Sequence, residues 1–266
     1  MSPLLDPRHP IHDIELLRQL HGRRLSSQLR VLCVIGAHRF QEMRLLLRVF
    51  PGLRHIYLFE PIRELQAGLQ ALAAKDARIR VFPVAISDRD GTAPFHITNN
   101  AGESSSLLAF GSHRQLFPEV VVQRTVEVPI RRLESILAEH RLEAPDLMLI
   151  DVQGAECQVL AAMGAQLLQH VRLIYTEVST ERVYESAGLL SDVEALLSPR
   201  FVNLGFAPIS AGVPIHGNAV FVSHEDSSAA LALTTVGRLR QAWRARRRRI
   251  RAERALRTAT AHQATP

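Results

Sequence analysis

Four acidic residues each follow an apolar run of the sequence, and such carboxylates can bind a ligand or accept a proton. They are Glu60, Asp88, Asp151 and Glu177, with Ser87 directly before Asp88. An ionised carboxylate accepts hydrogen bonds from hydroxyl and cationic groups, and a well-placed one serves as a general base. If the four runs are parallel strands, their carboxyl ends meet at one edge of a sheet, where open α/β sheets bind ligands. The sequence therefore predicts an acidic ligand site at that edge.

The segment around Asp151 shows most clearly which elements position these residues. The apolar run 147–150 ends on Asp151, turns through Gly154 and continues into an amphipathic stretch over 155–168. A strand without polar alternation needs cover on both faces, so this pattern predicts a central parallel strand followed by a helix. The same reasoning predicts seven strands in all, over residues 31–35, 56–59, 81–86, 147–150, 171–176, 201–206 and 218–223.

The connection between the last two predicted strands is too short for a crossover helix. We therefore expect the final strand to run antiparallel to its neighbour. Helices are predicted between the other strands, over residues 42–49, 61–74, 155–168 and 189–197. The expected fold is α/β, with a seven-stranded mixed sheet whose last strand is antiparallel and with helices on both faces. We also predict an inserted ribbon: two strands over 93–98 and 124–130, with the polar loop 99–106 between them.

Length and composition favour one large domain. A chain of 266 residues with 47% hydrophobic content can bury one α/β core. The two cysteines, Cys33 and Cys157, have no partners at metal-ligand spacing, so we expect no metal site and a reducing compartment. No secretion signal or membrane span is recognisable, which predicts a cytoplasmic protein. We predict a helical lead-in over 1–30, a domain over 31–225 and a basic helical or disordered tail over 226–266.

The formal charge of +6 is concentrated in that tail. Between Arg238 and Arg257 there are ten arginines against Glu253 alone, which leaves the rest of the chain mildly acidic. An acidic body disfavours nucleic-acid binding, because nucleic-acid-binding domains spread positive charge over the face that contacts phosphates. The tail has two interpretations: a helix that binds an anionic membrane surface or an acidic partner, or a solvated extension. The first would make the protein peripheral to the membrane.

The turn after the first predicted strand argues against a dinucleotide cofactor. It contains only Gly36, so the G-x-G-x-x-G fingerprint is absent, and the sequence has no P-loop. In Rossmann-like folds the acid after the second strand binds ribose hydroxyls, and Glu60 holds that place. An edge rich in carboxylates suits a cationic adenosine ligand. The expected cofactor is S-adenosylmethionine, which carries a sulfonium and an amino group.

Several motifs of this chain together match those of one known family. They are Phe59-Glu60-Pro61, Ala85-Ile86-Ser87-Asp88 followed by Gly91, the serine cluster from Ser104 to Leu108, Asp151-Val-Gln-Gly-Ala-Glu156, Glu177-Val-Ser179 and Asn218-Ala-Val-Phe221. Over roughly residues 31–223 the chain resembles the FkbM-type S-adenosylmethionine-dependent methyltransferases. The resemblance implies the class I methyltransferase fold, which is Rossmann-like. It also implies methyl transfer to a hydroxyl of a small-molecule or glycan acceptor, such as a sugar or a polyketide-like natural product.

The resemblance implies roles for individual residues. The cofactor-binding residues would be Gly36, Ala37, His38, Glu60, Pro61, Ser87 and Asp88. Asp151 is expected at the reactive end as hydrogen-bond acceptor or general base toward the acceptor hydroxyl, with Glu177 sharing that work or orienting the acceptor. The alternative for Asp151 is a helix N-cap, and Glu156 is expected to stabilise the helix start. Residues 104–106 have two interpretations, a lid over the acceptor or a flexible polar loop.

The chain departs from the family pattern at the first turn. Val34 stands where the family has an acid that helps to hold the cofactor's amino group, and Phe40 stands where it has a second glycine. Losing a charged hydrogen bond costs roughly 1.5 to 3 kcal/mol, or about ten- to a hundred-fold in affinity. These departures motivate a second hypothesis, a methyltransferase fold without catalysis that acts as a binding or scaffolding partner. A third hypothesis, nucleic-acid modification guided by the tail, lacks aromatic residues for base stacking.

Overall fold

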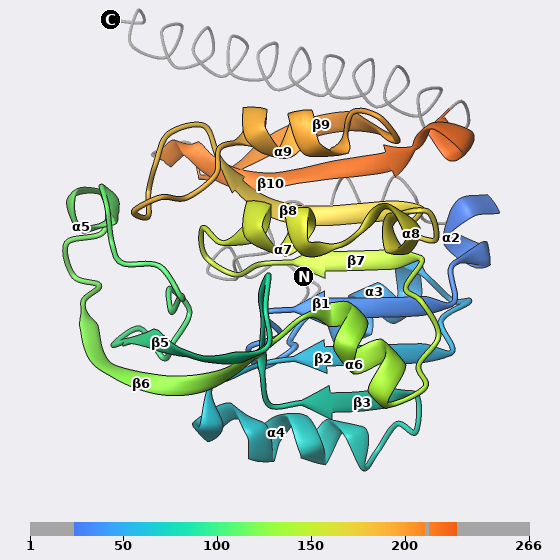
Figure 1. Ribbon diagram of the computed structural model, residues 1–266, viewed down its shortest axis with the longest axis horizontal. Helices are drawn as coiled ribbons and strands as arrows, with labels where there is room; N and C mark the ends of the chain where they lie inside the picture. The colour runs from blue at the N-terminus through green and yellow to red at the C-terminus, as the bar shows by residue number, and fades with distance from the viewer. Residues whose placement is uncertain (1–23, 211–212, 228–266) are drawn as a thin grey trace, which may run out of the picture. The chain divides into compact units, whose positions relative to one another are not determined.

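The computed structural model describes residues 24–210 and 213–227, and their main feature is a seven-stranded mixed sheet (Figure 1). Its strand order is β3-β2-β1-β7-β8-β10-β9. The strands are β1 (Val31–Ile35), β2 (His55–Phe59), β3 (Ile79–Phe82), β7 (Leu147–Ile150), β8 (Leu173–Ser179), β9 (Phe201–Ser210) and β10 (Val213–Ser223). The first five are parallel, and β10 runs antiparallel to both β8 and β9. The expected fold class and the reversed last strand are confirmed.

Helices cover both faces of this sheet. In Figure 1, α6 to α9 lie in front of the strands and α3 lies behind them. The helices are α2 (Arg24–Gln28), α3 (Met43–Val49), α4 (Arg63–Ala73), α5 (His113–Leu116), α6 (Leu133–Glu139), α7 (Glu156–Ala162), α8 (Ala165–Leu168) and α9 (Leu190–Leu197). Every residue of β1, β7 and β8 is buried, as expected for strands covered on both sides. Among the described residues, no helix has the length and apolar character needed to cross a bilayer.

The inserted region forms a second sheet beyond the carboxyl ends of the parallel strands (Figure 1). Its order is β4-β6-β5, with β4 (Ala85–Ile86), β5 (Gly91–Thr98) and β6 (Val122–Arg131). The single strand predicted over 81–86 is wrong in this respect, because the chain is divided between β3 in the main sheet and β4 in the small one. Pro83 stands at the division, where its missing N–H and fixed φ interrupt strand pairing.

Two other boundaries differ from the sequence prediction. The helix predicted over 155–168 is two helices, because Met163 is extended and Gly164, a poor helix former, separates α7 from α8. Strand β8 runs past 176 to Ser179, since β10 pairs along its whole length and sets Asn218 opposite Glu177. Glu177 therefore lies inside a strand. Of the predicted lead-in helix only residues 24–30 are described, and the tail from residue 228 lies outside the described residues.

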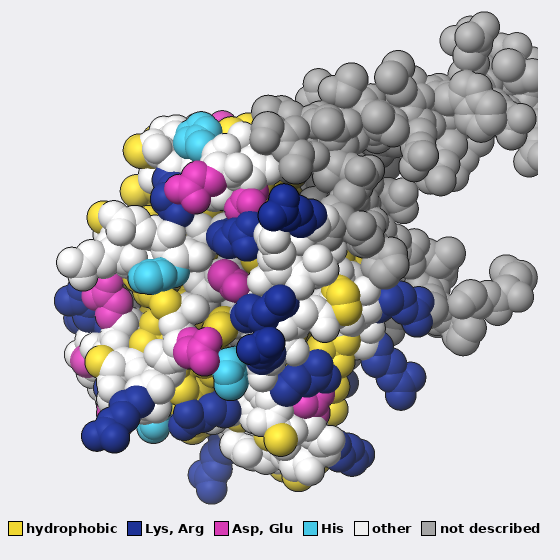
Figure 2. Space-filling model, turned by 90° about the vertical axis from the view of Figure 1, so that its right-hand side faces the viewer, with side chains coloured by type: hydrophobic (Ala, Val, Ile, Leu, Met, Phe, Trp, Pro, Cys, Tyr) yellow, Lys and Arg dark blue, Asp and Glu magenta, His cyan; other side chains and the backbone are white. Residues whose placement is uncertain are grey.

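The amino ends of the strands present a face rich in basic side chains, which in this chain are almost all arginines (Figure 2). Arginines stand directly before five of the strands: Arg30, Arg54, Arg78, Arg172 and Arg200. Several hold neighbouring segments: Arg172 pairs with Asp226 at 2.6 Å, and Arg78 pairs with Asp76 at 2.6 Å. The cavities at the opposite edge are lined by carboxylates that include Glu60, Asp151 and Glu177, so the two edges of the sheet differ in charge.

Candidate functional site

Two adjoining cavities lie at the carboxyl edge of the main sheet. The first combines Glu60 and Pro61 with the apolar side chains Ile62, Ile86, Phe95 and Leu107. The second combines Asp151 and Glu177 with His113, Tyr175, His216 and Asn218, and includes residues 34–42 of the first turn. Gly36, His38, Glu103, Asp151 and Gln153 line both cavities. The predicted acidic edge therefore borders a continuous site with one mostly apolar end and one acidic end.

The turn after β1 forms the junction between the cavities. Gly36 has a φ of 82°, and a Cβ there would collide with the main-chain carbonyl of Asp151, so only glycine fits. The main-chain N–H groups of Gly36 and Ala37 both donate to the carbonyl of Phe59 at 3.0 Å. His38 and Phe40 adopt the left-handed conformation as well, with φ of 46° and 48°. Such backbone is uncommon for non-glycine residues and is found often at binding sites.

Glu60 is buried and is fixed by main-chain donors. Its Oε2 accepts a hydrogen bond from the N–H of His38 at 2.8 Å, and its Oε1 accepts one from the N–H of Ile62 at 2.8 Å. Burial raises the pKa of Glu60 to about 7, although these two hydrogen bonds act in the opposite direction. Each carboxylate oxygen has a second lone pair, so Glu60 can still accept hydrogen bonds from a ligand.

Asp151, directly after β7, and Glu177, inside the neighbouring strand β8, lie close together as the sequence predicted, although Glu177 is not at the end of its strand. The side chain of Gln153 lies between them: its Nε2 donates to Oδ1 of Asp151 at 2.7 Å and to Oε2 of Glu177 at 2.5 Å. Asp151 is exposed because it opens onto the cavities, yet protein surrounds the carboxyl on its other sides. The loss of water around the carboxyl on those sides raises the pKa of Asp151 well above its usual range, and the charge of Glu177 adds a smaller effect in the same direction.

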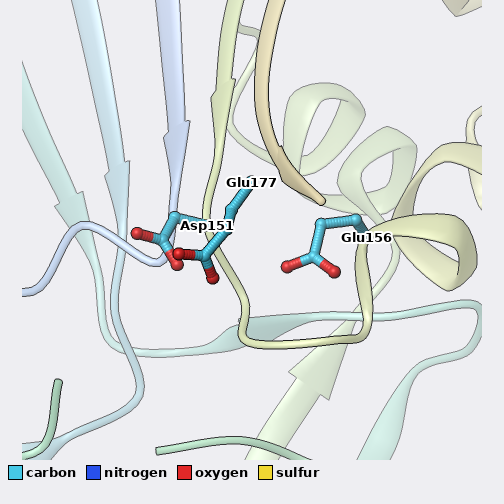
Figure 3. A group of neighbouring side chains, drawn as sticks. All are labelled: Asp151, Glu156 and Glu177. Carbon is cyan, nitrogen blue, oxygen red and sulfur yellow. The ribbon is translucent and has the colours of Figure 1, made fainter. Parts of the chain in front are cut away.

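Glu156 has a different role from the other two acids. In Figure 3 the carboxyl groups of Asp151 and Glu177 lie close together, and Glu156 lies apart, at the start of α7. Its Oε1 accepts hydrogen bonds from the N–H groups of Val152 at 3.0 Å and Gly154 at 3.1 Å. Glu156 therefore stabilises the approach to the helix, as predicted. The helix N-cap is Ala155, which does not support the interpretation of Asp151 as a cap.

The three carboxylates are close enough to raise the question of a metal ion. Oxygens of Asp151, Glu156 and Glu177 lie within 4.8 Å of one another. Protein donors already contact all three: the Gln153 amide, main-chain N–H groups and His216. We assign no metal to this group, because these hydrogen bonds account for the cluster.

His216 is a site residue that sequence reasoning missed. Its Nε2 lies 3.2 Å from Oε1 of Glu177, and its Nδ1 lies 2.8 Å from Oγ of Ser179, with both residues on β8. Burial alone lowers the pKa of His216, but the charge and hydrogen bond of Glu177 outweigh it and raise that pKa. The signal available in the sequence was that His216 stands two residues before the motif that begins at Asn218. In the structure Asn218 pairs with Glu177 across the two strands.

The remaining predicted residues separate into those that line the cavities and those that do not. Pro61 lines the first cavity, and Ala37 the second. Ser87 and Asp88 line neither: Ser87 is buried and hydrogen-bonds Asp88 at 3.2 Å, while the neighbouring wall is formed by residues 84–86. Phe40 is 2% exposed and belongs to the wall of the second cavity.

The serine cluster is divided in the same way. Ser104 lines the second cavity, whereas Ser105 lines the first and is buried. Ser105 Oγ accepts the N–H of Thr98 at 3.1 Å, and Ser106 Oγ donates to the carbonyl of Gln153 at 2.8 Å. The cluster therefore ties the inserted segment to the turn after β7.

The chain is similar in sequence to known methyltransferases. A family model described as the methyltransferase FkbM domain matches residues 35–207. The 2-O-methyltransferase NoeI of Sinorhizobium fredii is 33% identical over 184 residues, which span 67% of this chain and 74% of NoeI. The methyltransferase sdnD of Sordaria araneosa is 27% identical over 152 residues, which span 48% of this chain and 56% of sdnD.

A solved structure is also similar. The crystal structure of a methyltransferase FkbM from Methylobacillus flagellatus KT aligns with a TM-score of 0.49 at 14% identity. The alignment covers 74% of this chain and 44% of that chain, so the chain spans less than half of its length.

Proposed function

Because the chain belongs to the FkbM methyltransferase family, we propose that it transfers a methyl group from S-adenosylmethionine to a hydroxyl oxygen of a carbohydrate or natural-product acceptor. The observation that carries the proposal is the meeting of the two cavities at Asp151. One cavity offers a buried carboxylate and apolar walls, and the other offers the carboxylate pair of Asp151 and Glu177. A donor and an acceptor molecule would meet at the junction.

The residues of the first cavity fit the adenosine part of the cofactor. Glu60 has lone pairs left for ribose hydroxyls, and Ile62, Ile86 and Phe95 offer apolar surface to the adenine ring. Gly36 lets the first turn approach the end of β7 closely. At the junction, Asp151 places a carboxylate where the positive charge of a sulfonium would be favoured. S-adenosylmethionine, when bound, supplies a methyl group activated by that positive charge.

Asp151 is the proposed general base. A hydroxyl oxygen is a poor nucleophile until a base accepts its proton, and a positioned base contributes about 10²- to 10⁴-fold. The Asp151 carboxylate would accept the proton of the acceptor hydroxyl, while bound S-adenosylmethionine would supply the methyl group to that oxygen. Burial raises the pKa of Asp151, and a cation bound beside it favours the ionised form that the base requires. Glu177 orients the acceptor from the neighbouring strand.

The second cavity suits an acceptor without negative charge. Its acidic lining residues are Glu42, whose pKa burial raises to about 7, and Glu103, Glu119, Asp151 and Glu177; its basic ones are Arg39, His38, His113 and His216. A phosphate or carboxylate on the acceptor would face these carboxylates, and like charges at short range are unfavourable. Phe117 and Tyr175 add aromatic surface, against which the apolar faces of a sugar ring can pack. The acceptor is therefore proposed to be a neutral or cationic polyol.

The test is calorimetric titration of the full chain with S-adenosylhomocysteine, in parallel with Glu60→Ala and the control Glu64→Ala. Glu64 lies four residues further on α4 and pairs with Arg124 away from the cavities. Binding that is lost in Glu60→Ala and kept in Glu64→Ala supports the proposal. The absence of heat with the wild-type chain at high ligand concentration would favour the hypothesis of a non-catalytic scaffold that Val34 and Phe40 motivate.

A further inference from the structure

The amide of Gln153 connects the two proposed catalytic carboxylates through one atom. Its Nε2 donates one hydrogen to Asp151 at 2.7 Å and the other to Glu177 at 2.5 Å. Both N–H bonds of the amide are used in this way. Two carboxylates that share one donor atom lie close together, and they repel each other unless a donor or a shared proton lies between them. Here the donor is the neutral amide of Gln153.

Tyr184 fixes which way this amide faces. The Tyr184 hydroxyl lies 2.6 Å from Oε1 of Gln153 and 3.2 Å from the carbonyl of Ser104, so its single proton is directed to Gln153. Burial and, next, the charges of Glu177 and Asp151 raise the pKa of Tyr184 well above its usual range, which keeps the phenol a donor. If the Gln153 amide faced the opposite way, its Oε1 would lie against two carboxylates and the Tyr184 hydroxyl would lose this acceptor.

The backbone of Gln153 is also held in an unusual state. Gln153 has a φ of 57° and Gly154 a φ of 100°. A Cβ on Gly154 would lie 2.9 Å from Cβ of Tyr184, so the turn packs directly on the tyrosine ring. Ser106 Oγ donates to the carbonyl of Gln153 at 2.8 Å. A left-handed non-glycine residue is strained, and these contacts hold it in place.

We propose that Gln153 is the positioning residue of the carboxylate pair: its amide holds Asp151 and Glu177 in one hydrogen-bonded geometry, and Tyr184 fixes the amide. The inference rests on the proposed function only in naming Asp151 as the base. Without the amide, the two acids lose the neutral donor between them. Their affinity for a shared proton would rise further, so that Asp151 would serve as a base only at still higher pH.

Carboxyl titration by ¹³C NMR tests this without a cofactor or acceptor. The samples are the full chain labelled at Asp and Glu carboxyl carbons, with Gln153→Leu, Tyr184→Phe and the double variant. Resonances are assigned with Asp151→Asn and Glu177→Gln, and Gln123→Leu, an exposed glutamine on β6, is the control. Other ionisable groups facing the pair are Glu156 from α7, His216 from β10 and His113 from α5, so their titrations are followed too.

We expect Gln153→Leu to raise the titration midpoint of the pair by about one pH unit, a tenfold gain in proton affinity. Tyr184→Phe should raise it less, and should add nothing in the Gln153→Leu background, because it acts through the same amide. Unchanged midpoints in Gln153→Leu would overturn the proposal. If that variant does not fold, an unchanged midpoint in Tyr184→Phe would overturn it instead.

A failure of the proposed function is a separate result. It would be seen as absent S-adenosylhomocysteine binding by the wild-type chain, whether or not the carboxyl midpoints move. A loss of packing alone would lower the melting temperature of the variants without shifting the midpoints, which distinguishes a structural role from the proposed one.

Discussion

The carboxylate of Glu60 accepts a hydrogen bond from the main-chain N–H of His38 at 2.8 Å, which joins the end of β2 to the turn after β1. The same carboxylate accepts the N–H of Ile62 at 2.8 Å. The acid proposed to hold the ribose thus also holds the turn that approaches the junction of the two cavities. A substitution at Glu60 should therefore affect both ligand binding and the stability of the ligand-free protein.

In the absence of ligand, the stability of Glu60→Gln relative to that of the wild type is expected to increase as pH rises. Burial raises the pKa of Glu60 to about 7 from 4.5, so the folded wild type holds its proton more tightly than the unfolded chain. That contribution to stability is present below pH 4.5 and is lost as pH rises through 7, on the order of 2 kcal/mol between pH 5 and 8. The uncharged variant lacks this loss. Urea unfolding of both proteins at pH 5 and pH 8 measures the difference, and a difference that does not change with pH would contradict the buried-charge explanation.

Asp151→Asn should lower kcat by about 10²- to 10⁴-fold with little change in the affinity for S-adenosylhomocysteine, because the amide cannot accept the hydroxyl proton. The wild-type rate should increase with pH through the raised pKa of Asp151, since only the ionised carboxyl is a base. The variant should lack that dependence. The measurement is transfer of labelled methyl to a polyol acceptor at several pH values. A variant that keeps the wild-type rate would exclude Asp151 as the base.

The charge of the acceptor should determine whether it is methylated. Of two matched acceptors, a neutral glycoside and the same glycoside bearing a phosphate, the neutral one is expected to react at least tenfold faster in kcat/KM. The reason is the set of carboxylates that includes Glu103, Glu119 and Glu177 in the second cavity. Competition between the two acceptors in one reaction measures the ratio of their kcat/KM values directly. A preference for the phosphorylated acceptor would show that the second cavity is not the acceptor site.

Phe40→Gly tests whether the aromatic side chain at the first turn is structural. The ring is 2% exposed, so its removal should cost about 3 to 5 kcal/mol, offset by roughly 1 kcal/mol because glycine adopts the φ of 48° without strain. We expect a lower melting temperature and S-adenosylhomocysteine binding at least as tight as in wild type. Binding ten times weaker in a folded variant would instead make the ring part of the cofactor site.

Much of the fold could be predicted because it depends on local pattern. The runs 31–35 and 147–150 have no polar alternation, and such runs need cover on both faces wherever they lie. The errors in element boundaries at Pro83 and at Gly164 came from residues whose effect on the backbone depends on which sheet or helix the neighbouring chain joins, and the extension of β8 to Ser179 came from its pairing with β10. The placement of β10 between β8 and β9 also required the tertiary structure.

The sequence by itself determined the sheet, its reversed last strand and the delivery of Glu60, Asp151 and Glu177 to one edge, because burial and strand direction follow from residue pattern. The tertiary structure alone decided what surrounds those acids. Gln153 meets Tyr184 and Glu177, and His216 meets Glu177, only through packing between segments far apart in the chain. Such contacts depend on register and on side-chain direction, which no local pattern specifies.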